Sequence, residues 1–231
     1  MKKLVQQYFA DIPRGPAVNR RTTVPAVTIP RDTFLVLEDK VQLPRLYYTW
    51  HSVKGFSKDD AALDLLAQIL ANDRNSRLYK KLVYEMQTAQ NVNAFQDGSR
   101  LDGKFQLTVT PKPGQQAADI DKVVRTEIAS LINGGVTARE LQRAQNVYKA
   151  SFLNRLASVL GKAEVLNTYN YYIGNPDYVQ QDAARYERVT AADVQRVART
   201  YLGRPKIVLT VVPEGKKEMM LTAASAVGGD R

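Results

Sequence analysis

The sequence contains no cysteine and a single histidine, His51, among its 231 residues. Without cysteine there are no disulfides, no thiolate nucleophiles and no thiolate-ligated zinc. One histidine cannot supply the two imidazoles that catalytic zinc sites usually require. His51 lies in a strand-like run beside Trp50, which favours a structural or surface role over metal ligation. The composition therefore predicts no metal site in this chain.

Long apolar runs and phosphate-binding loops are missing as well. No stretch approaches the roughly 18 to 20 apolar residues that cross a bilayer. The first residues lack the apolar core of a secretory signal peptide, so no targeting signal is predicted. No glycine-rich loop of the Walker or dinucleotide type is present. With 44% hydrophobic and 24% charged residues, the composition is typical of a soluble globular protein.

The formal charge of +10 is concentrated at the front of the chain, where residues 1–58 hold ten basic and four acidic side chains. Several of these basic residues are arginines that lie among prolines. Proline disfavours helix and favours an extended connector. Aromatic interleaving and a nucleic-acid-binding motif are lacking, so a solvated linker is favoured over a nucleic-acid partner. Before the linker, Leu4, Tyr8 and Phe9 have helical spacing over too few residues to be stable unaided.

Apolar periodicity predicts an α+β order of elements. The predicted strands are 33–38, 45–53, two around 92–94 and 105–109 that form a hairpin, and 207–212. The predicted helices carry apolar positions at 63–70, 78–86, 120–131, 141–152 and 194–201. Regular alternation of strand and helix is absent, so a mainly antiparallel sheet with helices packed on one face is expected. We divide the chain into residues 1–30 (end of a preceding domain and linker), 31–213 (domain) and 214–231 (mobile tail or next linker).

Capping signals support two of these helices. Thr137 followed by Glu140 forms a capping box for a long helix that continues or kinks beyond Gly161. Thr190 with Asp193 is a weaker variant of the same box. Asp59, Asp60 and Asp64 resemble an acid cluster, but carboxylates at the start of a helix offset its dipole, so no paired catalytic acid is predicted.

Several segments together resemble the inactive repeat domain of the insulinase and pitrilysin family of zinc metallopeptidases, which includes mitochondrial processing peptidases. LPRLYYTW at 43–50 resembles the first core strand of that family, and DLLAQILANDRNSRLYKKLVYE at 64–85 resembles its helix pair. Three further signatures follow in the family's order: TPKPG at 110–114, GGVTARELQRAQ at 134–145 and VTAADVQRVARTYL at 189–202. YFADIPRG at 8–15 also resembles the closing helix of a preceding domain and the start of its linker.

The resemblance implies a non-catalytic domain. The family's zinc motif, His-x-x-Glu-His with a distal Glu, is missing. In the opposite half of such proteins an Arg after a helix Leu, and a Tyr seven residues later, hold the substrate. When that pattern is set on Leu82, Val83 and Gln90 occupy the two positions. Neither part of the catalytic apparatus therefore carries over to this chain.

Two further groups of residues are site candidates. Arg77 and Tyr79 are candidate substrate contacts, because arginine pairs bidentately with carboxylates; a helix-start arginine and a packing tyrosine are the alternative. The tyrosines at 169, 171, 172 and 178 form either a peptide-binding surface or a packed core edge.

We therefore predict a domain that completes the substrate chamber of an insulinase-like zinc peptidase and packs on its zinc-bearing domain, in the same or a partner chain. Zinc is expected in that partner domain and not in this chain, and the ligand is a peptide. The parent protein is expected to be a zinc metalloendopeptidase, although this chain alone is inactive. The alternative is a catalytically dead scaffold in a larger complex. A bacterial periplasm or cell-envelope setting fits the habit of the family.

Overall fold

A computed structural model describes residues 1–19 and 21–227 of the chain. Its strands are β1 (Thr33–Asp39), β2 (Arg45–His51), β3 (Ala89–Gly98), β4 (Gly103–Pro111) and β5 (Ile207–Pro213). Its α-helices are α1 (Lys2–Phe9), α2 (Asp60–Ala71), α3 (Ala117–Gly134), α4 (Ala138–Ala157), α5 (Val159–Ile173), α6 (Val179–Glu187), α7 (Ala191–Val197) and α8 (Ala223–Val227). The remaining elements are two π-helical segments, η1 (Tyr79–Glu85) and η2 (Ala198–Leu202), and a 3-10 turn, η3 (Lys217–Met219).

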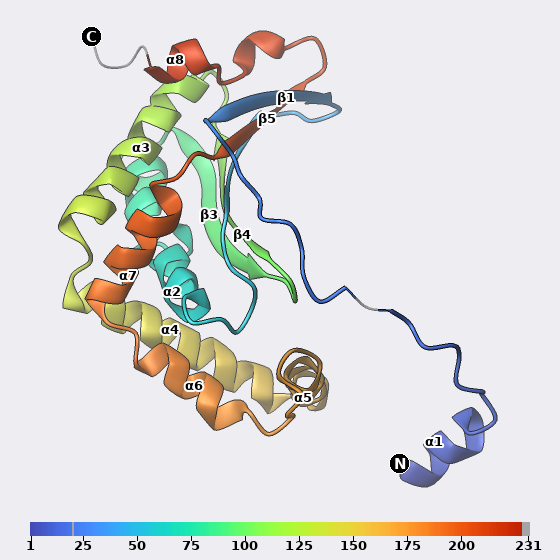
Figure 1. The fold of residues 1–231 in the computed structure, drawn as a ribbon. Helices are drawn as coiled ribbons and strands as arrows, with labels where there is room; N and C mark the ends of the chain where they lie inside the picture. The colour runs from blue at the N-terminus through green and yellow to red at the C-terminus, as the bar shows by residue number, and fades with distance from the viewer. Residues whose placement is uncertain (20, 228–231) are drawn as a thin grey trace.

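The five strands form one mixed sheet in the order β1-β5-β2-β4-β3. β1 and β5 are parallel, whereas the other three neighbouring pairs are antiparallel. β3 and β4 form the predicted hairpin, joined by residues 99–102. Figure 1 shows the helices α2, α3, α4, α6 and α7 gathered on one side of this sheet. The predicted fold class, a mainly antiparallel sheet covered on one face, is confirmed.

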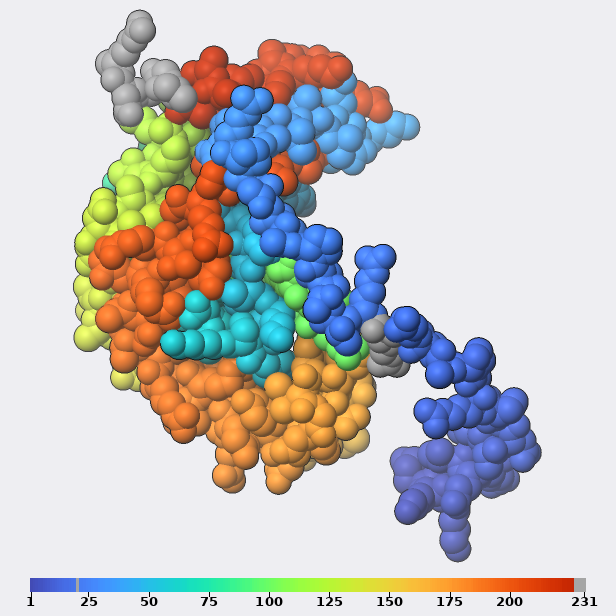
Figure 2. Space-filling model, viewed as in Figure 1, coloured from blue at the N-terminus to red at the C-terminus, as the bar shows by residue number. Residues whose placement is uncertain are grey.

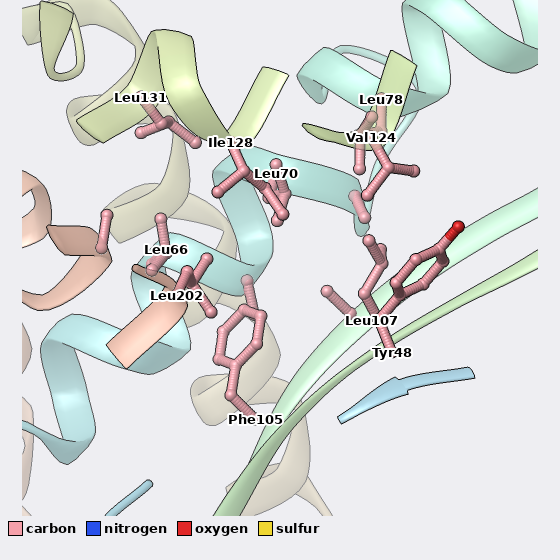
Figure 3. Packing of buried hydrophobic residues seen from close by; sticks show 14 of the residues in the cluster. Tyr48, Leu66, Leu70, Leu78, Phe105, Leu107, Val124, Ile128, Leu131 and Leu202 are labelled. Carbon is pink, nitrogen blue, oxygen red and sulfur yellow. The ribbon is translucent and has the colours of Figure 1, made fainter. Parts of the chain in front are cut away.

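Alternation along the strands explains why one face is covered. In β2, Leu46, Tyr48 and Trp50 are buried, while the residues between them point to the opposite face and are half-buried or exposed. Figure 3 shows Tyr48 and its neighbours from β4 facing the apolar side of α2 and α3. The labelled core residues are Tyr48, Leu66, Leu70, Leu78, Phe105, Leu107, Val124, Ile128, Leu131 and Leu202. The second face of the sheet has no helix over it among the described residues.

Both capping boxes form. Thr137 accepts a hydrogen bond from the backbone of Glu140, whose side chain accepts from the backbone of Thr137. Thr190 and Asp193 make the same reciprocal pair. The long helix does not run through Gly161: it breaks at Ser158, whose side chain caps the start of α5.

The expected helix at 78–86 differs from the prediction. Leu78 and Leu82 are buried as expected, but the segment is π-helical and Met86 is 42% exposed. The helix ends at Glu85, and Gln87 adopts a positive φ of 54° that turns the chain into β3. Met86 therefore lies beyond the regular face that the spacing suggested.

The two ends of the chain differ in how they meet the domain. α1 buries none of its residues, and an exposed connector joins it to β1, so it stands apart from the domain (Figure 1). The segment after Pro213 was expected to be mobile, yet it packs on the domain: Leu221 is fully buried and Ala226 nearly so. Residues 228–231 of that expected tail lie outside the described residues. Among the described residues no helix is both long and apolar enough to serve as a membrane span.

Candidate functional site

Arg77, the first candidate substrate contact, is bound inside the domain. Its Nε donates to Glu140 Oε1 at 2.7 Å, and its Nη2 donates to Glu140 Oε2 at 3.0 Å and to the carbonyl of Gly135 at 2.9 Å. Glu140 is also the carboxylate of the capping box at the start of α4. The hydrogen bond from Arg77, followed by the backbone bond from Thr137, lowers the pKa of Glu140 to about 2 against the effect of burial. Arg77 thus ties the segment before η1 to the turn between α3 and α4.

Tyr79, the second candidate, is half-buried and packs against the hydrophobic core from the start of η1. Val83, at the position of the family's arginine, is half-buried against the same core. Gln90, at the position of the family's tyrosine, is exposed at the beginning of β3. The structure therefore brings no arginine and tyrosine pair together at these two positions.

The residues present do not fit a catalytic zinc ion. His51 lies at the end of β2, and its Nε2 is 2.7 and 2.8 Å from the two carboxylate oxygens of Asp102 in the β3–β4 connection. In the described part of the chain no cluster of three or more His, Asp or Glu residues has a geometry that suits a metal. Two imidazoles and a carboxylate around one open position are the minimum of the family's site. One histidine cannot provide them.

A polar cleft of about 470 Å³ lies between α2, α4, α5 and α6. It contains three carboxylates, Asp60 and Asp64 from α2 and Asp182 from α6, together with a single buried cation, Arg185. Arg185 donates from Nη2 to Asp60 at 2.9 Å and from Nη1 to Asp182 at 2.7 Å. One guanidinium therefore bridges the helices α2 and α6 across 125 residues of sequence.

Asp64 has no cation of its own in this cleft. The hydroxyl of Tyr186 donates to its Oδ2 at 2.6 Å. Burial, followed by the negative charge of Asp60, raises the pKa of Asp64 to about 7. Burial also raises the pKa of the Tyr186 hydroxyl well above its ordinary value, so Tyr186 remains a donor at neutral pH. The pair acts as a neutral or singly charged link between α2 and α6.

The tyrosines of α5 and the following turn pack against one another. Phe56, with a φ of 60°, has its ring 5.9, 5.5 and 6.2 Å from those of Tyr169, Tyr172 and Tyr178. The hydroxyl of Tyr169 donates to Asp182 at 2.9 Å. Tyr171 lies at the outer edge of the cluster: its ring is 5.0 Å from that of Tyr172, it is 51% exposed, and it lies under the guanidinium of Arg100. Of the two interpretations of this cluster, the packed core edge fits three of the four tyrosines.

Sequence reasoning missed the cleft because its members are distant in the chain. Asp60 and Asp64 were interpreted only as charges near a helix start, whereas their partners Arg185 and Tyr186 come more than 120 residues later. The spacing of Asp60 and Asp64, four residues apart on one helix face, was the single local signal. As the cleft stands, it holds internally paired polar groups and no poised nucleophile.

The fold is that of an α+β domain with a mixed five-stranded sheet and helices on one of its faces. A family model described as the peptidase M16 inactive domain matches residues 1–148. The chain therefore belongs to the peptidase M16 inactive-domain family, and the resemblance to insulinase-type zinc peptidases is confirmed. No curated protein matches the chain in sequence.

Solved structures share the fold. A protease from Helicobacter pylori is 19% identical to this chain, with a TM-score of 0.76; the matched region covers 92% of this chain and 51% of that protease. A peptidase M16 inactive domain from Pseudomonas fluorescens is 18% identical with a TM-score of 0.78, covering 95% and 52%. A putative zinc protease from Bordetella pertussis is 25% identical with a TM-score of 0.65, covering 74% and 94%. The chain thus spans about half the length of the first and second of these structures.

Proposed function

We propose that this domain completes the substrate chamber of an insulinase-like zinc peptidase by packing on a zinc-bearing domain, which carries out the hydrolysis. The observation that carries the proposal is membership of the inactive-domain family together with a residue set that cannot ligate zinc. The zinc ion, the water it activates and the general base then reside in the partner domain. This chain contributes position and enclosure.

Two features support a partner outside this chain. The face of the sheet opposite the helices exposes apolar side chains such as Leu35 and Leu37, which are 47% and 51% exposed in β1. α1 is amphipathic but buries no residue, although a helix of eight residues is marginal without packing. We assign residues 1–30 to the end of a preceding domain and its linker, so that α1 packs on that domain.

The test combines this chain with the zinc-bearing M16 domain encoded in the same genome. We expect the 231-residue chain alone to bind no stoichiometric zinc and to show no EDTA-sensitive hydrolysis of a fluorogenic peptide. The zinc-bearing domain should gain peptidase activity when the chain is added, and the gain should saturate with its concentration. Binding without any gain in activity would favour the scaffold alternative. Zinc binding or hydrolysis by the chain alone would overturn the proposal.

A further inference from the structure

The segment that contains α5 and α6 contributes little to the main hydrophobic core. Within residues 158–187, all of which the structure describes, Tyr186 is the one member of that core. Val165 and Tyr169 are buried outside it, and Tyr169 packs on Phe56 instead. Figure 1 shows the segment at the end of the helical layer opposite α8, and Figure 2 shows it, in orange, at the surface of the molecule. We call residues 158–187 the α5–α6 arm.

Non-helical residues bound this arm at both ends. Ser158, with φ −96° and ψ 152°, separates α5 from α4, and Thr190, with φ −101° and ψ 164°, follows the arm at the start of α7. Residues at the ends of helices are where a packed element can rotate while its own hydrogen bonds stay intact. Segments that bury few apolar side chains also open at a lower free energy than the core. The arm therefore has the features of a unit that opens separately from the rest of the domain.

Polar and aromatic contacts hold α6, the second helix of the arm, on α2 and α4. Arg185 donates to Asp60 of α2 at 2.9 Å, and the hydroxyl of Tyr186 donates to Asp64 of α2 at 2.6 Å. The ring of Tyr186 also stacks on that of Tyr148 in α4, with the ring centroids 3.4 Å apart. Both hydrogen bonds end on carboxyl groups of the polar cleft, so the attachment of the arm depends on the charge of that cleft.

The charges of the cleft balance only while one carboxyl group keeps its proton. The lining contains three carboxyl groups, Asp60, Asp64 and Asp182, and two guanidinium groups, Arg155 and Arg185. Arg185 donates to Asp60 and Asp182, and Arg155 is exposed, so Asp64 is left with a hydroxyl as its partner. The pKa of Asp64, which burial and then the charge of Asp60 raise to about 7, agrees with this charge count.

The other titratable side chains that line the cleft are hydroxyl groups, those of Tyr148 in α4, Tyr172 in α5 and Tyr186 in α6. A phenol ordinarily ionises near pH 10, and burial raises the pKa of both Tyr148 and Tyr186 further. Glu164 of α5 lines an adjoining cavity. Across neutral pH, Asp64 is therefore the group of the cleft that changes its charge.

We propose that the α5–α6 arm is a pH-sensitive conformational switch, which stays closed on α2 while Asp64 is protonated and opens about Ser158 and Thr190 when Asp64 ionises. The ionised group adds a negative charge beside Asp60 that no cation of the cleft compensates, and opening returns this charge to water. The switch is a property of this chain alone, so its test requires no zinc-bearing domain.

The direction of the pH dependence follows from the proton that Asp64 holds in the closed state. Its pKa of about 7 lies above the ordinary value of 3.8, so closure is favoured most below about pH 4. As the pH rises toward 7 the arm loses this stabilisation, and above that value the opening constant levels off. Between pH 5 and 8 the opening constant rises by about a hundredfold at most.

Hydrogen exchange of backbone amides, measured by mass spectrometry on the 231-residue chain from pH 5 to pH 8, tests the switch. Dividing the rates by the intrinsic exchange rate at each pH gives opening constants where closing is faster than exchange. For the slowest amides of α5 and α6 we expect a rise of roughly tenfold or more over this range. At each pH their opening constants should exceed those of the β3–β4 hairpin by roughly tenfold or more.

Two variants assign the proton. Asp64→Asn cannot ionise and still accepts from Tyr186, so its opening constants should change little between pH 5 and 8. Asp59→Asn removes a carboxylate that hydrogen-bonds to Arg196 outside the cleft, and it should keep the wild-type rise.

Three results would overturn the inference. Opening constants of α5 and α6 that stay unchanged with pH in the wild type would show that no proton controls the arm. Equal opening constants for the arm and the hairpin at every pH would show that the arm opens only when the whole domain unfolds. A wild-type rise that persists in Asp64→Asn would assign the proton to another group.

Discussion

At the scale of single residues, Arg77 is a structural link whose removal should weaken the fold. Arg77→Ala leaves Glu140 without its cation and the carbonyl of Gly135 without its donor. We expect a loss of about 2 kcal/mol in the free energy of unfolding, the usual range for hydrogen bonds to charged groups. Arg77→Lys should recover only part of it, because lysine lacks the planar fork. Urea unfolding followed by circular dichroism measures both.

The same residue was a candidate substrate contact, and the two roles have different signatures. A structural role predicts that Arg77→Ala lowers stability while KM of the reconstituted peptidase changes little at temperatures where the variant is folded. A direct contact predicts a raised KM in Arg77→Lys with stability near wild type. The second pattern would contradict our assignment.

Asp64 should make the stability of the domain depend on pH. Its folded pKa of about 7 lies above the ordinary value of 3.8, so the folded state binds the proton more tightly than the unfolded state. The stabilisation is complete below about pH 4 and is lost as pH rises to 7, with an upper limit of about 4 kcal/mol. Asp64→Asn cannot ionise and still accepts from Tyr186, so its stability should vary less over this window.

A neighbouring carboxylate supplies the control for this pH profile. Hydrogen bonding to Arg196 lowers the pKa of Asp59, which therefore stabilises the fold above its ordinary pKa and loses this effect in acid. Asp59→Asn should keep the wild-type slope between pH 5 and 8. If Asp64→Asn keeps that slope as well, Asp64 is not the group responsible.

At the scale of elements, the break between α4 and α5 depends on Gly161. A Cβ at this position would lie 1.9 Å from the carbonyl oxygen of Arg155 and 2.9 Å from Ser158 Oγ, which caps the helix. We expect Gly161→Ala to destabilise the domain by about 1–3 kcal/mol, the typical cost of overpacking. Gly134 is the matched control, because a Cβ there meets nothing within 4 Å. Gly134→Ala should be neutral or slightly stabilising. Equal urea midpoints for the two variants would contradict this account.

Elements whose signals are local were predictable, and those that depend on distant partners were not. The capping box of Thr137 and Glu140 is written within four residues, and it formed as predicted. A π-helical turn such as η1 has no apolar spacing of its own that distinguishes it from an α-helix. The sequence therefore predicted an ordinary helix through Met86. The hydrogen bonds of Asp60 and Asp64 could not be predicted, because apolar periodicity carries no information about partners more than 120 residues away.

At the scale of the whole molecule, the fold class followed from patterning, although only one of the four strand pairings, the β3–β4 hairpin, joins strands that are consecutive in the sequence. Alternation in β3 and β4 predicted strands with one buried face, and the short connection between them predicted their pairing as a hairpin. β1 and β5, by contrast, pair in parallel across the length of the domain. Nothing local distinguishes such a pairing, so the strand order came from the structure alone.

The two ends of the chain should contribute unequally to the stability of the molecule. A variant that begins at Arg31 loses α1 and the connector, in whose described residues no side chain is buried, and keeps the bond from Lys206 N to Asp32. We expect its unfolding free energy to stay within about 0.5 kcal/mol of wild type, as for surface changes in general. A variant that ends at Glu214 loses the fully buried Leu221, whose backbone N–H donates to Thr210 Oγ1.

Removing that segment uncovers part of the core beside β5, and the expected loss is about 2–5 kcal/mol, the range for deleting a buried leucine side chain. Leu221→Ala tests the same contact without shortening the chain and should account for most of the loss. Urea unfolding of the three variants at one pH provides the comparison. If the variant ending at Glu214 is as stable as wild type, residues 214–227 are a mobile tail after all, and the domain ends at Pro213. A loss confined to the variant beginning at Arg31 would instead show that α1 packs on this domain and not on a preceding one.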